Sequence, residues 1–198
     1  MFPRTCQHCL KPLPCTARSD ARFCSGRCRV AAHRDRHTAD SASVLPSAIR
    51  DRARWIRHER KRPITVTGRA ASSTNARTWS TYEAARASTV GDGLGFVLDG
   101  DGIIGIDIDG CIENGNLAPW AARILADAPA TYAEVSPSGA GLHLFGFGRL
   151  PAGRVVHVAG GTVECYSRGR YLTVTGQRFE GAPSTLAPLG DFIASLTM

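Results

Sequence analysis

Apolar and polar residues alternate along several short stretches of this chain, which is the pattern of β-strands with one buried face. The clearest stretch is 103–109, where isoleucines at alternate positions are separated by Gly105, Asp107 and Asp109. Because successive side chains of a strand point to opposite faces, we expect the isoleucines to enter a core and the two aspartates to share the other face. The stretch therefore predicts a strand that carries two neighbouring carboxylates.

The same pattern predicts the other elements of the chain. Helical composition marks residues 79–87 and 117–128. Mostly consecutive strands with a few interspersed helices predict an α+β fold with a largely antiparallel sheet. With 198 residues and 43% hydrophobic content, the chain is long enough for one substantial core and a small metal-stabilised module. The further strands are predicted at 94–98, 131–136, 142–147, 162–166 and 170–175.

Two of these strands also carry a polar residue between apolar neighbours. His143 lies between Leu142 and Leu144, directly after the Ser- and Gly-rich segment 136–141, and Glu164 has apolar residues on both sides. A single histidine of this kind is often a hydrogen-bonded structural residue, and a single glutamate often faces solvent. Three strands that each carry polar groups in an apolar pattern favour a site built across a sheet.

Oxygen ligands at this spacing suit a divalent metal. Two like charges a few ångströms apart are costly without a cation, and carboxylates prefer Mg²⁺ or Mn²⁺. The alternative is a strand that ends in a polar turn at Asp109 and Gly110. Together, Asp107, Asp109 and Glu164 could hold two ions, an arrangement that catalyses phosphoryl transfer from a nucleoside triphosphate.

Phosphate-binding groups are available in the same region. His143 and Arg170, followed by Arg168, are the candidates for binding phosphate oxygens, since a guanidinium matches phosphate geometry. The turn from Ser138 to Gly141 could bring backbone N–H groups close to a triphosphate because glycine permits close approach. The alternative is a hairpin turn that needs glycine for its dihedral angles.

The order of these motifs resembles the archaeo-eukaryotic primase superfamily, most closely the bifunctional primase-polymerase (Prim-Pol) domains of phage and plasmid replication proteins. The resemblance covers about residues 60–180 and includes Lys61-Arg62-Pro63 and Thr78-Trp79. In that family the Asp-x-Asp motif binds metal, a small-x-His motif contacts the phosphates of the incoming nucleotide, and a third motif supplies another metal-binding acid.

Carried over by position, the resemblance assigns the catalytic residues Asp107, Asp109, His143 and Glu164, with Gly141 as the small residue before the histidine. The third acid is often Asp in relatives and is Glu here. The resemblance also implies a core similar to the RNA-recognition motif, a single-stranded DNA template and nucleoside triphosphates as partners, and Mg²⁺ or Mn²⁺ as cofactor.

The N-terminal part of the chain has a cysteine pattern typical of zinc sites. Two close pairs separated by fourteen residues fit a tetrahedral Zn²⁺ site of four thiolates. His33 and His37 lie one helical turn apart and could replace one or two cysteines, while Cys111 and Cys165 are expected to be buried apolar residues. The pattern resembles the short zinc knuckles of bacterial and phage proteins. The predicted zinc ligands are Cys6, Cys9, Cys24 and Cys28.

Positive charge is concentrated near the N-terminus. Residues 1–69 hold sixteen Lys and Arg against five Asp and Glu, a net charge of +11, whereas residues 70–198 have a net charge of −4. The segment 50–62 holds eight basic residues, seven Lys or Arg and one His, against two acidic ones, which predicts a surface helix or arm for a nucleic-acid backbone. A solvated helix face without a ligand is the alternative.

These observations predict three parts: a zinc knuckle at 1–37, a linker and basic arm at 38–62, and a primase-polymerase catalytic domain at 63–198. The chain lacks an apolar run of roughly eighteen residues and a secretory signal, so we expect a soluble, cytoplasmic protein without a membrane partner.

The predicted function is template-dependent nucleotidyl transfer in phage, prophage or plasmid DNA replication. A replicative helicase recruited in trans is a further expected partner, and the alternative is that the chain is a fragment of a primase-helicase. One alternative is a non-catalytic nucleic-acid-binding or replication-initiation module that retains the fold. A more remote alternative takes Asp107-x-Asp109 as the diphosphate-metal motif of a sugar transferase. Divalent-dependent nucleotide incorporation distinguishes the first function from the other two.

Overall fold

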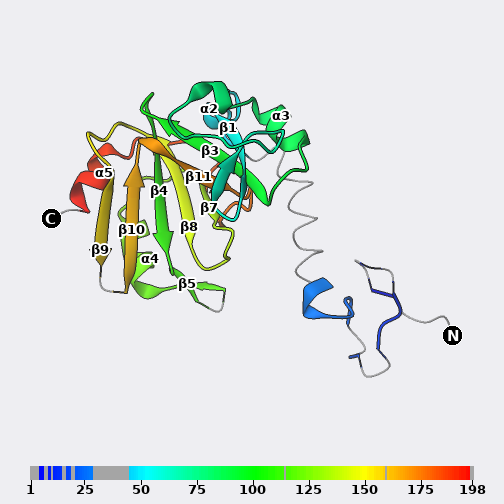
Figure 1. The fold of residues 1–198 in the computed structure, drawn as a ribbon. Helices are drawn as coiled ribbons and strands as arrows, with labels where there is room; N and C mark the ends of the chain where they lie inside the picture. Colours follow the sequence, from blue (N-terminus) through cyan, green and yellow to red (C-terminus); the bar gives the residue numbers. More distant parts are fainter. Residues whose placement is uncertain are drawn as a thin grey trace. The chain divides into compact units, whose positions relative to one another are not determined.

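The computed structural model describes residues 5–6, 9, 11–14, 17–18, 21–28, 45–113, 115–158 and 160–196. The chain divides into two compact units, residues 1–43 and 44–198 (Figure 1). This division falls inside the segment predicted as a linker and basic arm, so residues 44–62, the greater part of that segment, belong to the larger unit.

The larger unit contains two antiparallel sheets. The four-stranded sheet has the order β11-β3-β1-β2, with β1 at Trp55–Glu59, β2 at Arg62–Ile64, β3 at Gly93–Asp99 and β11 at Arg168–Val174. The five-stranded sheet has the order β7-β8-β4-β10-β9. Its strands are β4 at Ile103–Asp109, β7 at Ala133–Val135, β8 at Leu142–Phe147, β9 at Arg154–Val158 and β10 at Gly161–Tyr166.

Short elements complete the unit. Strands β5 and β6 form a small hairpin beyond β4, and α4 begins with Pro119, a residue suited to the first helical turn. The Thr81 side chain caps α3 by accepting a hydrogen bond from the Ala84 N–H. The bounds are α2 at Ser47–Arg50, η2 at Ala76–Thr78, α3 at Tyr82–Ala87, β5 at Ile112–Glu113, β6 at Asn116–Leu117, α4 at Pro119–Ala126 and α5 at Gly190–Ser195.

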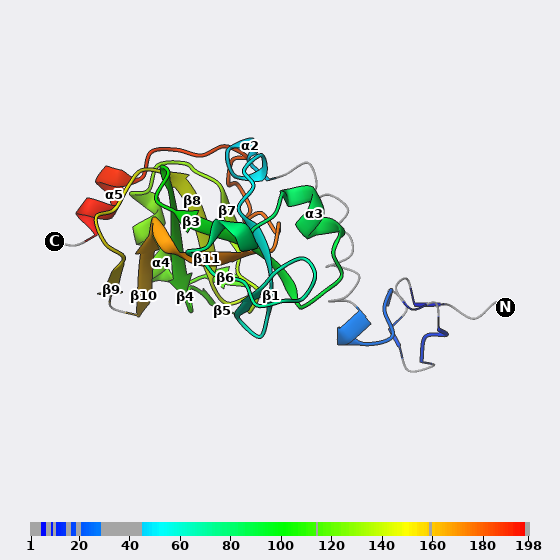
Figure 2. The ribbon, with the colours of Figure 1, turned by 45° about the horizontal axis from the view of Figure 1, so that its top comes forward.

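Two apolar clusters hold these layers together. One lies between the sheets, where Phe96 of β3 meets Phe145 of β8 edge to face with ring centroids 6.0 Å apart. The sheets lie close together at Gly105, where an added Cβ would lie 2.5 Å from Leu172 Cδ1. The other cluster covers the opposite face of the five-stranded sheet, where α4 contributes Ala121 and α5 contributes Phe192 and Ile193. Figure 2 shows these two helices beside the sheet. The five-stranded sheet therefore packs against α4 and α5 on one face and against the four-stranded sheet on the other.

The structure confirms the predicted α+β fold and its antiparallel strand pairing, but the strands form two main sheets where the sequence predicted one. The predicted strands at 103–109 and 142–147 coincide with β4 and β8, and Cys111 and Cys165 are buried as expected. The strands β1, β2 and β9 were not predicted, nor were the helices α2 and α5.

The prediction of a surface helix or arm at 50–62 is wrong, because most of this segment forms the β1–β2 hairpin. Trp55 and Ile56 are fully buried. Part of the charge that suggested an exposed arm is buried and paired: the Arg54 guanidinium lies 2.6 Å from Asp99 and 2.8 Å from Asp101.

The hairpin turn itself consists of Arg60 and Lys61, which both have positive φ angles, 47° and 66°. This backbone conformation is the one that tight hairpins with a mirror-image turn adopt. The turn presents its basic side chains to solvent, while the strands on either side of it join the sheet.

Candidate functional site

Four polar side chains form a row across the five-stranded sheet. Asp107 of β4 pairs directly with His143 of β8 on one side and with Glu164 of β10 on the other. His143 in turn pairs with Glu134 of β7. Because directly paired residues of neighbouring strands point to the same face, these four side chains lie side by side on one face of the sheet.

The row lies on the face that the sequence pattern predicted for the aspartates. Ile106 and Ile108 are fully buried in the cluster on the opposite face, beneath α4 and α5. Asp109 lies on the same face as Asp107, one step along the strand, and pairs with Thr162 of β10. The acidic residues and His143 are thus brought together from four separate strands.

The Asp107 carboxylate is partly buried and poorly compensated. Its side chain is 24% exposed, and its Oδ1 atom lies 3.5 Å from His143 Nε2 without a hydrogen bond from any described residue. Burial raises the pKa of Asp107, and the nearby charges of Asp109 and Glu164 raise it further, while His143 and Lys61 oppose the shift. An anion in this state is a suitable ligand for a cation.

His143 is buried and contacts both sheets. Its Nδ1 atom lies 2.9 Å from the carbonyl oxygen of Thr173 on β11 and 3.7 Å from Glu134 Oε1. Burial by itself lowers the pKa of His143, but the charges and hydrogen bonds of Glu134, Asp107 and Thr173 outweigh it, so the pKa is raised. The other ring nitrogen, Nε2, faces Asp107.

Sequence reasoning missed Glu134. This carboxylate is completely buried and accepts hydrogen bonds from the Tyr132 hydroxyl at 2.8 Å and from the N–H groups of Thr175 at 2.9 Å and Gly176 at 3.0 Å. Burial, followed by the charge of Glu134, raises the pKa of Tyr132. The sequence places Glu134 in a predicted strand, but only the pairing of β7 with β8 brings it to His143.

Glu164 is linked to one of the two candidate arginines. The Tyr166 hydroxyl donates to Glu164 Oε2 at 2.7 Å, and the Arg170 Cζ atom lies 5.1 Å from the centre of the Tyr166 ring. The register of β11 shifts between Arg168 and Arg170. Arg168 pairs with Asp99 and approaches Gly100, so the shift separates the two arginines, and Arg170 is the one beside the acids.

The turn before β8 holds its backbone donors internally. The N–H groups of Gly139, Ala140 and Gly141 donate to Ser136 O, Ser138 Oγ and Ser136 Oγ, respectively. An added Cβ on Gly141 would lie 2.8 Å from the Ile108 carbonyl oxygen and 3.6 Å from Asp109 Cα, so the turn packs against the end of β4. These contacts favour a structural turn, and nucleotide binding by Ser138 and Gly141 stays a prediction.

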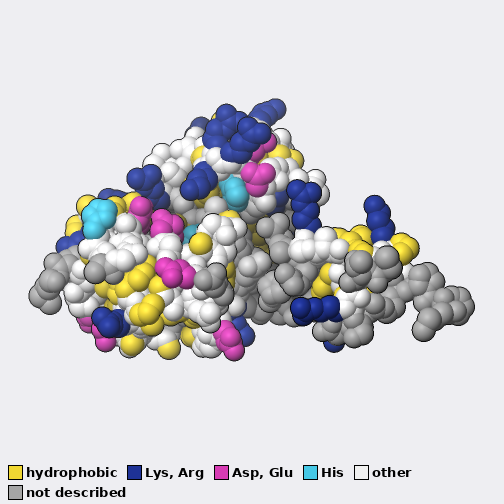
Figure 3. Space-filling model, turned by 90° about the horizontal axis from the view of Figure 1, so that it is seen from below, with side chains coloured by type: hydrophobic (Ala, Val, Ile, Leu, Met, Phe, Trp, Pro, Cys, Tyr) yellow, Lys and Arg dark blue, Asp and Glu magenta, His cyan; other side chains and the backbone are white. Residues whose placement is uncertain are grey.

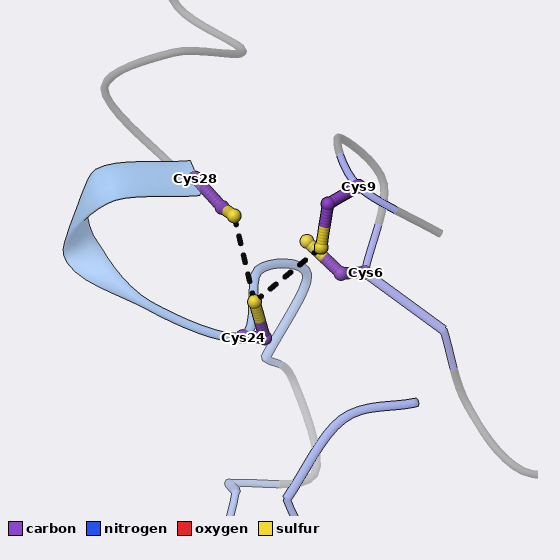
Figure 4. A group of neighbouring side chains, drawn as sticks. All are labelled: Cys6, Cys9, Cys24 and Cys28. Atoms are coloured by element: carbon purple, nitrogen blue, oxygen red, sulfur yellow. Dashed lines mark hydrogen bonds between the residues drawn. The ribbon is translucent and has the colours of Figure 1, made fainter. Parts of the chain in front are cut away.

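The four predicted zinc ligands lie together in the smaller unit (Figure 4). Their sulfur atoms lie within 4.8 Å of one another, with Cys9 and Cys24 at 3.6 Å and Cys24 and Cys28 at 3.5 Å. A tetrahedral zinc with Zn–S bonds of about 2.3 Å places its sulfurs about 3.8 Å apart, so the group fits the ion. The cluster consists of Cys6, Cys9, Cys24 and Cys28.

The thiol groups of this cluster form hydrogen bonds with one another. Contacts with Cys28 and Cys9 raise the pKa of Cys24 to about 12, because the neighbouring thiols stabilise its protonated form. Four thiolates at these distances therefore require a cation between them. His33 and His37, the alternative ligands, lie outside the described residues.

Figure 3 shows one face of the larger unit. Lys and Arg side chains gather at the top of this face with some Asp and Glu beside them, and further Asp and Glu side chains lie below, close to histidines. In the parts of the chain that the structure describes, no helix is long and apolar enough to cross a membrane.

A known protein is similar to this chain over most of this chain's length. No family model matches the chain. The chain is 33% identical over 159 residues to the DNA primase-polymerase of Nitratiruptor phage NrS-1, a match that covers 71% of this chain and 22% of the phage protein. The chain thus spans about a fifth of the length of this relative. The similarity supports the primase-polymerase type that the motifs suggested.

Proposed function

We propose that this chain is a template-dependent nucleotidyl transferase, a DNA primase-polymerase of phage, prophage or plasmid replication. The observation that carries the proposal is the row of Asp107, His143 and Glu164 on one sheet face, with Asp109 beside it. The similarity to the phage primase-polymerase and the motif order support the same conclusion. The proposal includes a catalytic core of the RNA-recognition-motif type with single-stranded DNA and nucleoside triphosphates as partners.

Asp107, Asp109 and Glu164 would hold two divalent ions, because the three carboxylates share a face and Asp107 Oδ1 has no hydrogen bond from the described residues. When bound, Mg²⁺ or Mn²⁺ supplies the charge neutralisation that phosphoryl transfer requires at the attacking and leaving oxygens.

The remaining residues bind and orient the triphosphate. His143 presents Nε2 on the acid row while Nδ1 is held by the Thr173 carbonyl, so a protonated Nε2 can donate to a phosphate oxygen. Arg170 lies beside Glu164 through Tyr166, and its guanidinium can donate two parallel hydrogen bonds to phosphate. The charge of Lys61, in the β1–β2 turn, also acts on Asp107.

The smaller unit is the second part of the proposal. Its four cysteines would hold one zinc ion, which stabilises a small fold around it. Residues 1–43 hold eight Lys and Arg against three Asp and Glu, so this unit is suited to contact the phosphates of a template strand. A replicative helicase is the protein partner expected for this activity.

A primer-extension assay on a single-stranded template, with Mg²⁺ or Mn²⁺ and both ribo- and deoxynucleotides, tests this function. We expect metal-dependent incorporation by the full chain and a loss of at least a hundredfold in Asp107→Ala, because several kcal/mol of transition-state stabilisation depend on the metal ligands. The exposed Asp127 at the end of α4 gives the matched control, Asp127→Ala, which should retain full activity.

Two results would contradict the proposal. Activity of Asp107→Ala within about tenfold of wild type would remove Asp107 from the catalytic centre. Template binding without any incorporation under these conditions would favour the alternative, a non-catalytic nucleic-acid-binding or replication-initiation module.

A further inference from the structure

Tyr166 occupies a defined place beside the acid row. It lies two residues after Glu164 on β10, so both side chains are on the same face, and its strand partner on β4 is Gly105, which has no side chain. On its other side, an added Cβ at Gly153 would lie 2.5 Å from the Cδ1 and Cε1 atoms of the Tyr166 ring. The ring thus fills the space that Gly153 leaves open, whereas Leu172 and Leu98 occupy the space over Gly105.

The two ends of the Tyr166 side chain contact different functional groups. The hydroxyl donates to Glu164 Oε2 at 2.7 Å, a short bond of the kind that carboxylates form with hydroxyl groups. The ring lies under the Arg170 guanidinium, whose Cζ atom is 5.1 Å from the ring centre, within the range of a cation–π contact. Arg170 is an exposed residue, so without this contact its long side chain has many open rotamers.

We infer that Tyr166 is a positioning residue that holds Glu164 and Arg170 in one fixed arrangement, so that the metal-binding acid and the phosphate-binding guanidinium meet the same triphosphate. This inference rests on the proposed function and assigns Tyr166 a task in that site. The hydroxyl limits the rotation of the carboxylate, and the ring restricts the guanidinium. The first task depends on the hydroxyl and the second chiefly on the ring, because Arg170 also acts on the hydroxyl.

The separation of tasks allows a test with two variants. Tyr166→Phe removes the hydroxyl and keeps the ring under Arg170, whereas Tyr166→Leu removes both. The first measurement is the affinity of the nucleotide-free full chain for Mn²⁺, which reports on Glu164. Electron paramagnetic resonance of the free ion gives this affinity. Equilibrium binding of dATP and ATP at saturating Mn²⁺, without a template, reports on Arg170.

We expect Tyr166→Phe to weaken Mn²⁺ binding about threefold to tenfold, as for the loss of one hydrogen bond, with triphosphate affinity unchanged within about twofold. Tyr166→Leu should weaken Mn²⁺ binding equally and also lower triphosphate affinity about twofold to fivefold. In the Arg170→Ala background, Tyr166→Leu should produce no further loss of triphosphate affinity, because the contact it removes is already absent. The matched control is Tyr82→Phe, a tyrosine in the core between the sheets.

Thermal unfolding of each variant verifies that the fold is retained. If Tyr166→Leu does not fold, Tyr166→Phe and Arg170→Ala decide the matter: the first must affect Mn²⁺ binding alone, and the second must affect triphosphate binding. Equal triphosphate affinities in the Phe and Leu variants, or additive losses in the Leu and Arg170→Ala pair, would overturn the inference. Binding data of the expected pattern without incorporation would contradict the proposed function and leave the inference standing.

Discussion

The Nδ1 atom of His143 on β8 lies 2.9 Å from the carbonyl oxygen of Thr173 on β11, so a side chain of the five-stranded sheet is fastened to the backbone of the four-stranded sheet. A carbonyl oxygen can only accept, and Nδ1 must therefore carry the proton. This contact fixes the ring and leaves Nε2 on the side of Asp107. The orientation of His143 depends on the packing of both sheets.

The Glu134→Gln variant tests the support of His143. The carboxylate accepts from Tyr132 and from two backbone N–H groups, and an amide places its own NH₂ donor against one of these donors. We expect the free energy of unfolding to fall by about 1–3 kcal/mol, the cost of an unsatisfied buried polar group. Unfolding in denaturant measures this free energy. The control is Glu113→Gln, a change at an exposed glutamate, which should alter the free energy of unfolding by less than about 0.5 kcal/mol.

The Asp107→Asn variant tests the electrostatics of the acid row in metal-free protein. Burial raises the pKa of Asp107 in the folded state above its unfolded value, so ionisation of this carboxyl destabilises the fold. The stability that the protonated acid provides is fully present below the unfolded pKa and is lost as the pH rises through the folded pKa. We therefore expect Asn to raise the melting temperature at pH 7 in the presence of a chelator.

This gain should shrink as the pH is lowered toward the ordinary carboxyl range, since the wild-type acid is then protonated too. Addition of Mn²⁺ should stabilise the wild type more than Asp107→Asn. A melting temperature of Asp107→Asn below that of the wild type at pH 7 without metal would show that the negative charge of Asp107 stabilises the fold.

The boundary between the two units predicts where the chain can be truncated without loss of the fold of the larger unit. A fragment of residues 44–198 should retain a cooperative thermal transition, because it contains both sheets. A fragment that starts at residue 63 lacks β1, including the fully buried Trp55 and Ile56, and should not fold, since loss of such side chains costs several kcal/mol each. Circular dichroism during heating distinguishes the two fragments.

Removal of residues 1–43 should weaken single-stranded DNA binding and flatten its dependence on salt. The deleted segment has a net charge of +5, and fewer phosphate contacts release fewer counterions. Binding isotherms at several salt concentrations give the slope for the full chain and for residues 44–198. An unchanged slope would show that the template contacts only the larger unit.

Zinc content tests the smaller unit independently. We expect about one zinc per chain by elemental analysis, and a clear loss of zinc in Cys24→Ser, whose sulfur lies between those of Cys9 and Cys28. The thermal transition of the larger unit should stay the same in this variant, because residues 44–198 form their own core. Cys111→Ser is the control, since Cys111 lies in that core and should not affect the zinc content.

Local sequence pattern was sufficient for the strands that carry the site. Alternation of period two is a property of each strand alone, and it correctly placed Asp107 opposite Ile106 and Ile108 and His143 opposite its leucine neighbours. The pattern of one strand does not show which other strands will pair with it. Glu134 was missed because its proximity to His143 follows from the pairing of β7 with β8, which no local pattern encodes.

The misread basic segment has a similar cause. A high charge density suggested an exposed helix, yet Arg54 is neutralised by Asp99 and Asp101, more than forty residues away in the sequence. The roles of Arg168 and Arg170 were likewise inseparable in the sequence, because the irregular register of β11 at Gly169 decides which arginine lies beside Tyr166.

The row of Glu134, His143, Asp107 and Glu164 draws one residue from each of four adjacent strands, and the backbone ladder spaces those strands about 4.8 Å apart. The spacing of the centre is thus independent of how much chain joins one strand to the next. Insertions in the connecting segments can lengthen the protein without displacing any of these four side chains. A deletion of one residue inside β8 or β10 would turn His143 or Glu164 to the apolar face, so evolution of this centre is free in its loops and constrained in its strands.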